Sequence, residues 1–127
     1  MALNIIKTTR VSPATNSSPD STNSLILPLT FFDLRWIRSH PTQQVLFYKL
    51  SHSESSREHF HTSILPKLSL SLSLVLRHYL PLAGHLTWWT PHDPKPRITV
   101  SNDSTVSLTI AESEADFSIV SGKGLRL

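Results

Sequence analysis

The sequence has no cysteine, and this absence excludes disulfides, thiolate chemistry and cysteine–zinc sites anywhere in its 127 residues. A chain without disulfides is typical of proteins in a reducing compartment. No apolar run approaches the roughly 18 residues of a membrane-spanning helix. The first segment, MALNIIKTTR, has no apolar core long enough for a secretory signal peptide. We therefore expect a soluble, cytoplasmic protein with no membrane span.

Clustered positive charge is also absent. The formal net charge is only +3 and the 12 lysine and arginine residues are scattered, whereas nucleic-acid binding needs a concentrated basic face. Gly122 and Gly124 form too short a motif for a phosphate-binding loop, which needs a third glycine and a following helix. The composition, with 39% hydrophobic and 17% charged residues, is typical of a folded chain of at most one domain.

The longest apolar stretch spans residues 64–86, and its pattern has two interpretations. Between residues 68 and 74 leucine and serine alternate, which is typical of a half-buried strand. Over the wider window, apolar residues recur at helical spacing, namely Leu65, Leu68, Leu72, Val75, Leu76 and Tyr79. Because the run is longer than most strands, we predict a helix with Pro66 in its first turn and Pro81 and Gly84 at its end. Leu70 and Leu74 fall on the opposite side, so this helix should lie between two layers.

Three other segments have simpler patterns. Residues 2–11 mix β-branched and basic side chains and predict a short edge strand. Residues 12–24 are rich in Ser, Asn, Pro and Asp and predict a flexible, solvated loop. Residues 45–50, VLFYKL, combine β-branched and aromatic side chains and predict a strand.

Two further strands are expected towards the C-terminus. Polar and apolar side chains alternate in residues 95–100 and again in residues 106–110. Between them, Asn102, Asp103 and Ser104 supply the residue types that favour tight turns. We therefore predict that the two strands form a hairpin.

Residues 27–36, LPLTFFDLRW, hold a dense group of aromatic and apolar side chains. Thr30 can cap a helix whose first turn contains Asp33, where a carboxylate interacts favourably with the helix dipole. We predict a short helix here that docks on the core.

Several of these segments form a recognisable series: LPLTFFDLRW (27–36), VLFYKL (45–50), HYLPLAGHL (78–86) and AESEADF (111–117). In this order and spacing they resemble the N-terminal part of the plant BAHD acyltransferases, especially the branch that malonylates anthocyanin and other flavonoid or phenolic glucosides. The chain departs from the family at Asn102, where Gly is usual, and at His85, where Arg or Lys is usual.

The resemblance implies an α/β fold. Residues 1–127 would be an incomplete N-terminal domain of a two-domain fold related to chloramphenicol acetyltransferase, with one long helix against short, mostly antiparallel or mixed strands. It also implies an acyl-CoA-dependent O-acyltransferase that binds no permanent cofactor. The co-substrate would be acyl-CoA, with malonyl-CoA favoured, and the acceptor a hydroxyl of a flavonoid or phenolic glucoside. The intact enzyme would be monomeric.

The catalytic motifs of that family are absent from this sequence. In the family the general base is the histidine of a His-x-x-x-Asp motif, because imidazole can take the proton of an attacking hydroxyl near neutral pH. None of the seven histidines here has an aspartate four residues later. Asp116 and Phe117 precede Ser118, so the Asp-Phe-Gly-Trp-Gly motif is missing too. We expect both motifs, and with them the general-base histidine, to lie beyond Leu127, and we expect the chain alone to be inactive. The alternative is a truncated, non-catalytic protein that is inert or only binds a partner.

No catalytic residue is therefore assigned to this chain. The resemblance implies that the segment entering the first central strand runs near the acceptor pocket. On that basis we predict that Asp33, Trp36, Thr42 and Gln44 support the substrate pocket, with plain packing and loop roles as the alternative. His59 and His61 are two residues apart, which is not the spacing of a metal pair on one helix face, and no cysteine or carboxylate completes a metal site.

Overall fold

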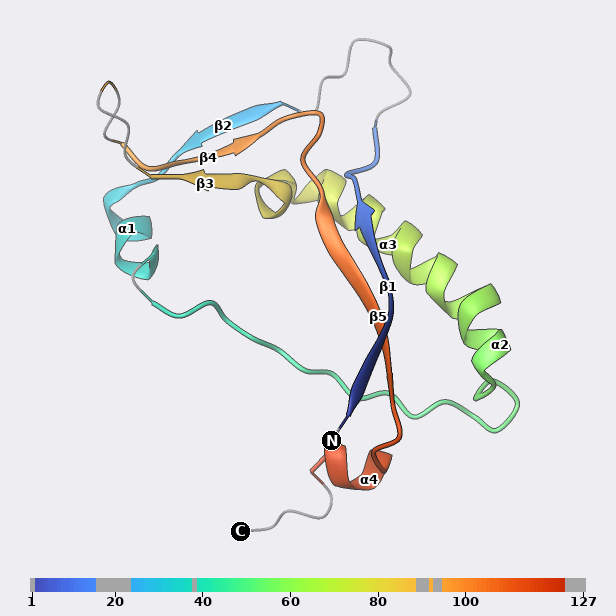
Figure 1. Cartoon of the computed structure of the whole chain (residues 1–127). Coiled ribbons are helices and arrows are strands. Elements are labelled where there is room, and N and C mark those ends of the chain that lie inside the picture. Colours follow the sequence, from blue (N-terminus) through green and yellow to red (C-terminus); the bar gives the residue numbers. More distant parts are fainter. Residues whose placement is uncertain (1, 16–23, 38, 89–91, 93–94, 123–127) are drawn as a thin grey trace.

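The computed structural model describes residues 2–15, 24–37, 39–88, 92 and 95–122, and it shows two small antiparallel sheets beside one long helix (Figure 1). The first sheet is a two-stranded ribbon of β1 (Leu3–Val11) and β5 (Val106–Ser113). The second has the strand order β2 (Leu25–Pro28), β4 (Arg97–Val100) and β3 (His85–Thr87). The prediction of a mixed α/β fold with antiparallel strands is confirmed.

The ribbon joins the two ends of the described chain. Leu3 pairs with Ser113 and Val11 with Val106, with one irregularity between Ile5 and Lys7. The strand expected at residues 2–11 is therefore present, and the strand expected at 106–110 continues to Ser113.

The predicted hairpin between the last two strands is wrong. β4 is the middle strand of its sheet and has β2 on one edge and β3 on the other, so no edge remains for β5. The turn does form: the Ser101 N–H donates to Ser104 Oγ at 2.9 Å, and the Ser104 N–H donates to the Ser101 carbonyl at 3.0 Å. This turn directs the chain out of the three-stranded sheet and into the ribbon.

The long helix is present but shifted towards the N-terminus. It begins with α2 (Arg57–His59), passes through a π-helical turn, η1 (Phe60–Ile64), and continues as α3 (Leu65–His78). Proline has no N–H and its ring crowds the preceding turn. The π turn lies directly before Pro66, with the Leu65 N–H bonded to the Phe60 carbonyl, and we attribute the wider turn to this proline.

The helix ends earlier than residue 86. After His78 the chain forms a single 3-10 turn, η2 (Leu80–Ala83), and enters β3 at His85. Pro81 lies within this turn and Gly84 follows it, as expected for residues that terminate a helix.

The core lies where α3 meets the ribbon. Leu76 is 2% exposed and packs with Val11 and Ala83, and three half-buried residues surround them: Leu72, Val106 and Leu108. The opposite side of the helix has no covering layer among the described residues, since Leu70 is 62% exposed. The described chain therefore covers one of the two apolar sides of the helix, and a second layer over the other side, supplied by a larger fold, stays a prediction.

Two loop regions also differ from expectation. Residues 45–50 form no strand, because no described segment runs beside them to complete a ladder. Within the predicted loop 12–24, residues 16–23 lie outside the described residues. The part before them is anchored rather than free: the Ser73 hydroxyl donates to the Ser12 carbonyl at 2.8 Å, and the Ala14 N–H donates to the Ser73 carbonyl at 3.0 Å.

Within the described part of the chain, no helix has the length and apolar character needed to cross a bilayer.

Candidate functional site

Asp33 lies in the first turn of α1 (Phe31–Ile37), where it forms a reciprocal cap with Thr30. Its Oδ2 accepts hydrogen bonds from the Thr30 hydroxyl at 2.6 Å and from the Thr30 N–H at 2.7 Å. The Asp33 N–H donates back to Thr30 Oγ1 at 3.4 Å. These bonds satisfy donors that a helix start leaves unpaired. The predicted cap is confirmed, and it gives Asp33 a role in starting the helix.

The same bonds lower the pKa of Asp33, first through the Thr30 hydroxyl and then through the Thr30 N–H, because both favour the charged carboxylate. A lowered folded-state pKa means that the cap stabilises α1 above the unfolded pKa. That contribution is lost as the pH falls through the folded pKa.

We expect Thr30→Ala to raise the pKa of Asp33 towards its ordinary value and to reduce the population of α1. Carboxyl NMR titration of Asp33 measures the first effect, and the Cα chemical shifts of α1 measure the second. Ser118→Ala is the matched control, since it removes the analogous hydroxyl bond to Asp116 and should leave Asp33 unchanged. An unaltered Asp33 titration in Thr30→Ala would contradict this account of the cap.

Trp36 is on the same short helix, but the helix does not dock on the core. Phe31 is 83%, Phe32 80% and Trp36 73% exposed, so the predicted docking is wrong for the described chain. The cause is the lack of a second layer: α1 extends away from both sheets at the edge of the molecule (Figure 1). Its aromatic side chains form an exposed apolar surface.

Thr42 and Gln44 lie on the exposed stretch that connects α1 with α2, which has no regular structure. Within the described chain, no hydrogen bond joins either of them to Asp33 or Trp36. The structure thus places the four predicted residues on consecutive segments without assembling them into a pocket.

A different feature is a hollow on the described part of the chain. It has a volume of about 1090 Å³ and lies between the end of β5, the start of α2 and α4 (Phe117–Val120). Its apolar lining includes Leu50, Phe60, Ile110 and Ile119.

Three charged groups of this hollow, Arg57, Glu112 and Asp116, already have partners. Arg57 forms an ion pair with Glu112, but the side chains are 75% and 32% exposed, and such surface pairs contribute little stability. Asp116 accepts from the hydroxyl and the N–H of Ser118, which lowers its pKa and caps α4. These contacts give the carboxylates of Glu112 and Asp116 structural roles.

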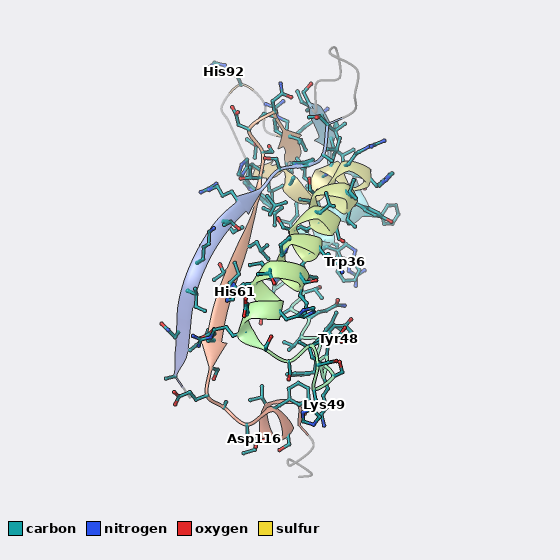
Figure 2. All side chains as sticks on the ribbon, turned by 90° about the vertical axis from the view of Figure 1, so that its right-hand side faces the viewer. Trp36, Tyr48, Lys49, His61, His92 and Asp116 are labelled. Carbon is teal, nitrogen blue, oxygen red and sulfur yellow. The ribbon has the colours of Figure 1, made fainter. Side chains whose placement is uncertain are left out.

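The histidines do not form a catalytic group either. His61 lines the hollow, and its ring packs edge-on against Phe60 at a centroid distance of 5.4 Å. Figure 2 shows His61 on the long helix and His92 at one end of the molecule, while Asp116 lies at the other end. Among the described residues no hydroxyl is hydrogen-bonded to an imidazole, and no group of His, Asp and Glu could hold a metal ion.

The general base predicted beyond Leu127 is not tested by this structure. The described part of the chain ends at Gly122, so Leu127 itself lies outside the described residues. The position of that histidine therefore stays a prediction.

Sequence reasoning missed the hollow because its two sides come from segments far apart in the chain. Arg57 and Glu112 are separated by 55 residues and carry no shared local pattern. One signal was available: Asp116 followed two residues later by Ser118 is typical of a capped helix start.

Comparisons with known proteins match the chain to a family model and to several plant acyltransferases. A family model described as the Transferase family matches residues 1–120. Over all 127 residues the chain is 60% identical to a BAHD acyltransferase of Arabidopsis thaliana. It is also 56% identical over 126 residues to two other Arabidopsis thaliana proteins, agmatine coumaroyltransferase and phenolic glucoside malonyltransferase 2. These matches cover 99% or more of this chain but 27% of each relative, so the chain spans about a quarter of their length.

Proposed function

The chain belongs to the BAHD acyltransferases of the Transferase family, and on that premise we propose that it is the N-terminal part of an acyl-CoA-dependent O-acyltransferase. The proposed reaction transfers malonyl, or another acyl group, from CoA to a hydroxyl of a phenolic or flavonoid glucoside. The observation that carries this proposal is the match of nearly the whole chain to phenolic glucoside malonyltransferases, at 56% and 51% identity.

In this proposal the chain supplies scaffold and pocket wall, and the general base comes from residues beyond Leu127. A neutral hydroxyl is a poor nucleophile until its proton is removed, and no histidine here has the His-x-x-x-Asp spacing. The cap of Asp33 fixes the start of α1, which holds Trp36 on an exposed surface. Thr42 and Gln44 follow on the adjoining stretch and would face the acceptor.

The same proposal includes the fold, the oligomeric state and the cellular location of the full-length enzyme. The exposed apolar surfaces of α1 and α3 suit a chain that forms one part of a two-domain fold related to chloramphenicol acetyltransferase. We propose a monomeric, cytoplasmic enzyme that uses malonyl-CoA as co-substrate and holds no permanent cofactor.

A second candidate is transfer of a coumaroyl group to an amine. It is favoured by one observation, the equal identity of the chain to agmatine coumaroyltransferase. The two candidates share the acyl-CoA donor and the family scaffold, and they differ in acyl group and acceptor.

The test uses chimaeras. The 127-residue chain replaces the matched quarter of phenolic glucoside malonyltransferase 2 in one chimaera and that of agmatine coumaroyltransferase in another. We expect malonyl transfer to a phenolic glucoside in the first, with a smaller loss of kcat/KM than the second suffers in its own reaction. The 127-residue chain alone should not exceed a heat-inactivated control.

Each outcome has a clear meaning. Turnover by the isolated chain would contradict the proposal that the general base comes from residues beyond Leu127. A smaller loss in the coumaroyltransferase chimaera would favour the second candidate. Folded but inactive chimaeras of both kinds would instead favour a truncated, non-catalytic protein, since the parent enzymes assayed in parallel supply intact catalytic motifs.

A further inference from the structure

Residues 12–15, here called the strap, follow β1 and lie against α3 (Figure 1). Ser73 anchors the strap: its hydroxyl donates to the Ser12 carbonyl at 2.8 Å, and its own carbonyl accepts from the Ala14 N–H at 3.0 Å. Pro13 is buried between these two contacts, whereas Ser12 is exposed. Both bonds use backbone groups of the strap, so the Ser12 hydroxyl is not part of the anchor.

The dipeptide of Ser12 and Pro13 has the sequence that proline-directed protein kinases phosphorylate. These kinases bind the substrate serine in an extended segment and require a proline directly after it. A residue before proline favours this extended backbone. Ser18 and Thr90 also precede prolines, but they lie outside the described residues. Because such dipeptides are common, the surroundings of the serine must show whether a phosphate would fit.

The surroundings of Ser12 suit a phosphate group. Ser12 and Arg10 line a second hollow, of about 540 Å³, together with Ser69 and Ser73 of α3. Arg10 is exposed and donates to the neutral Thr105 hydroxyl at 3.4 Å, a contact that leaves its positive charge uncompensated. A phosphate on Ser12 would therefore meet a guanidinium and two hydroxyls, all of which can donate hydrogen bonds to phosphate oxygens.

We propose that Ser12 is phosphorylated by a proline-directed serine/threonine kinase, and that Arg10 and the two serines of α3 then hold the phosphate. In this reaction Ser12 Oγ attacks the γ-phosphorus of ATP, and the bond from this phosphorus to the oxygen that bridges to the β-phosphate breaks. ADP leaves, and the hydroxyl proton passes to the base of the kinase. The phosphate carries about −1.5 to −2 charge at neutral pH, so it adds charged contacts between the strap, β1 and α3. This inference does not depend on the acyl group or the acceptor proposed above.

The anchor on Ser73 limits access to the site, because the strap must leave α3 before Ser12 can enter the active site of a kinase. Ser73→Ala removes the hydroxyl bond to the strap and keeps the carbonyl that binds Ala14. We expect it to raise the initial rate of phosphorylation about fivefold, the change in an opening equilibrium that one ordinary hydrogen bond produces. Ser71→Ala is the matched control, since Ser71 is exposed on the same helix and does not line the hollow. Equal rates in the two variants would contradict this role of the anchor.

The first test maps the modified residue. Ser18→Ala and Thr90→Ala are combined, which leaves Ser12 as the only serine or threonine of the 127-residue chain that precedes a proline. The 127-residue chain and the malonyltransferase chimaera, both with these changes, are treated with a purified mitogen-activated protein kinase and ATP. Phosphopeptides are then mapped by mass spectrometry. We expect a phosphate at residue 12 in both proteins and none within residues 1–127 when Ser12→Ala is added.

The second test measures whether Arg10 holds the phosphate. Phosphorus NMR follows the second ionisation of the phosphoserine as the pH is varied. We expect its midpoint to lie about half a pH unit lower with Arg10 present than in Arg10→Gln, because a nearby positive charge favours the doubly charged phosphate. Lys7→Gln is the matched control, since it removes the same charge from the opposite face of β1 and should not move the midpoint.

Each result supports or overturns the proposal. A phosphate at residue 12 in the 127-residue chain but not in the chimaera would overturn it, because the longer protein would then hide the site. A phosphate on neither protein would also overturn it. The same midpoint in Arg10→Gln and Lys7→Gln would show that Arg10 does not hold the phosphate. Phosphorylation at residue 12 of a chimaera that lacks acyl transfer would support this inference while the proposed function fails.

Discussion

Replacing Leu76 by alanine is expected to lower the free energy of unfolding of the 127-residue chain by about 2–5 kcal/mol. Leu76 is only 2% exposed and lies at the centre of the cluster with Val11 and Ala83. Truncation removes apolar atoms from a packed site and leaves a cavity that the ribbon and helix can close only in part. Because few described side chains are fully buried, this loss would be a large share of the total stability.

Urea denaturation followed by circular dichroism measures the effect. Leu70→Ala is the matched control, since it deletes the same atoms from the same helix but at a position that is 62% exposed. The control should change the free energy of unfolding by less than about 0.5 kcal/mol. Equal losses in the two variants would show that α3 does not pack on the ribbon through its Leu76 side.

The second large effect is expected at Gly84, where the chain leaves η2 and enters β3. A Cβ at this position would lie 2.5 Å from Ile98 Cγ2, 3.0 Å from Val100 Cγ2 and 3.1 Å from the Thr99 carbonyl oxygen. Since the first distance is far below van der Waals contact, Gly84→Ala must shift the Ile98 side chain or the strand that carries it. We expect a loss of about 1–3 kcal/mol, the usual cost of overpacking.

A rescue variant tests this steric cause. Leucine carries one carbon on Cβ where isoleucine carries two, so Ile98→Leu removes the branch that produces the shortest contact at little change in volume. In the Gly84→Ala background it should restore part of the lost stability, while alone it should cost less than about 1.5 kcal/mol. Purely additive losses in the double variant, measured by the same denaturation, would contradict a clash with Ile98.

Local features of this fold could be predicted from the sequence because their causes are local. The cap of Thr30 and Asp33 and the end of the long helix near Pro81 depend on residues a few positions apart. The start of the helix at Arg57 was missed because its cap, Ser56, is preceded by other serines that offer the same chemistry.

Pairing between strands could not be predicted in the same way. The alternation in β4 and β5 shows that each is a strand, but it does not specify a partner, and the turn at Ser101 and Ser104 suits a hairpin as well as a crossing between sheets. Which pairing forms depends on β1 and β2, both more than 60 residues away along the chain. The candidate site could be predicted only in part for the same reason. Trp36 and Gln44 lie in short segments with a recognisable pattern, whereas the residues that would complete a pocket around them come from other parts of the protein.

The ribbon of β1 and β5 also affects folding during translation, because its two strands are synthesised far apart in time. The hydroxyls of Thr8 and Thr109 lie 3.2 Å apart across a sequence separation of 101 residues. At typical ribosome speeds of about 5–20 residues per second, β5 is translated roughly 5–20 s after β1. During that interval the unpaired backbone edge of β1 is open to chaperones and to aggregation. Pairing over so long a separation is also slow to nucleate, so formation of this ribbon is expected to limit the rate of folding of the chain.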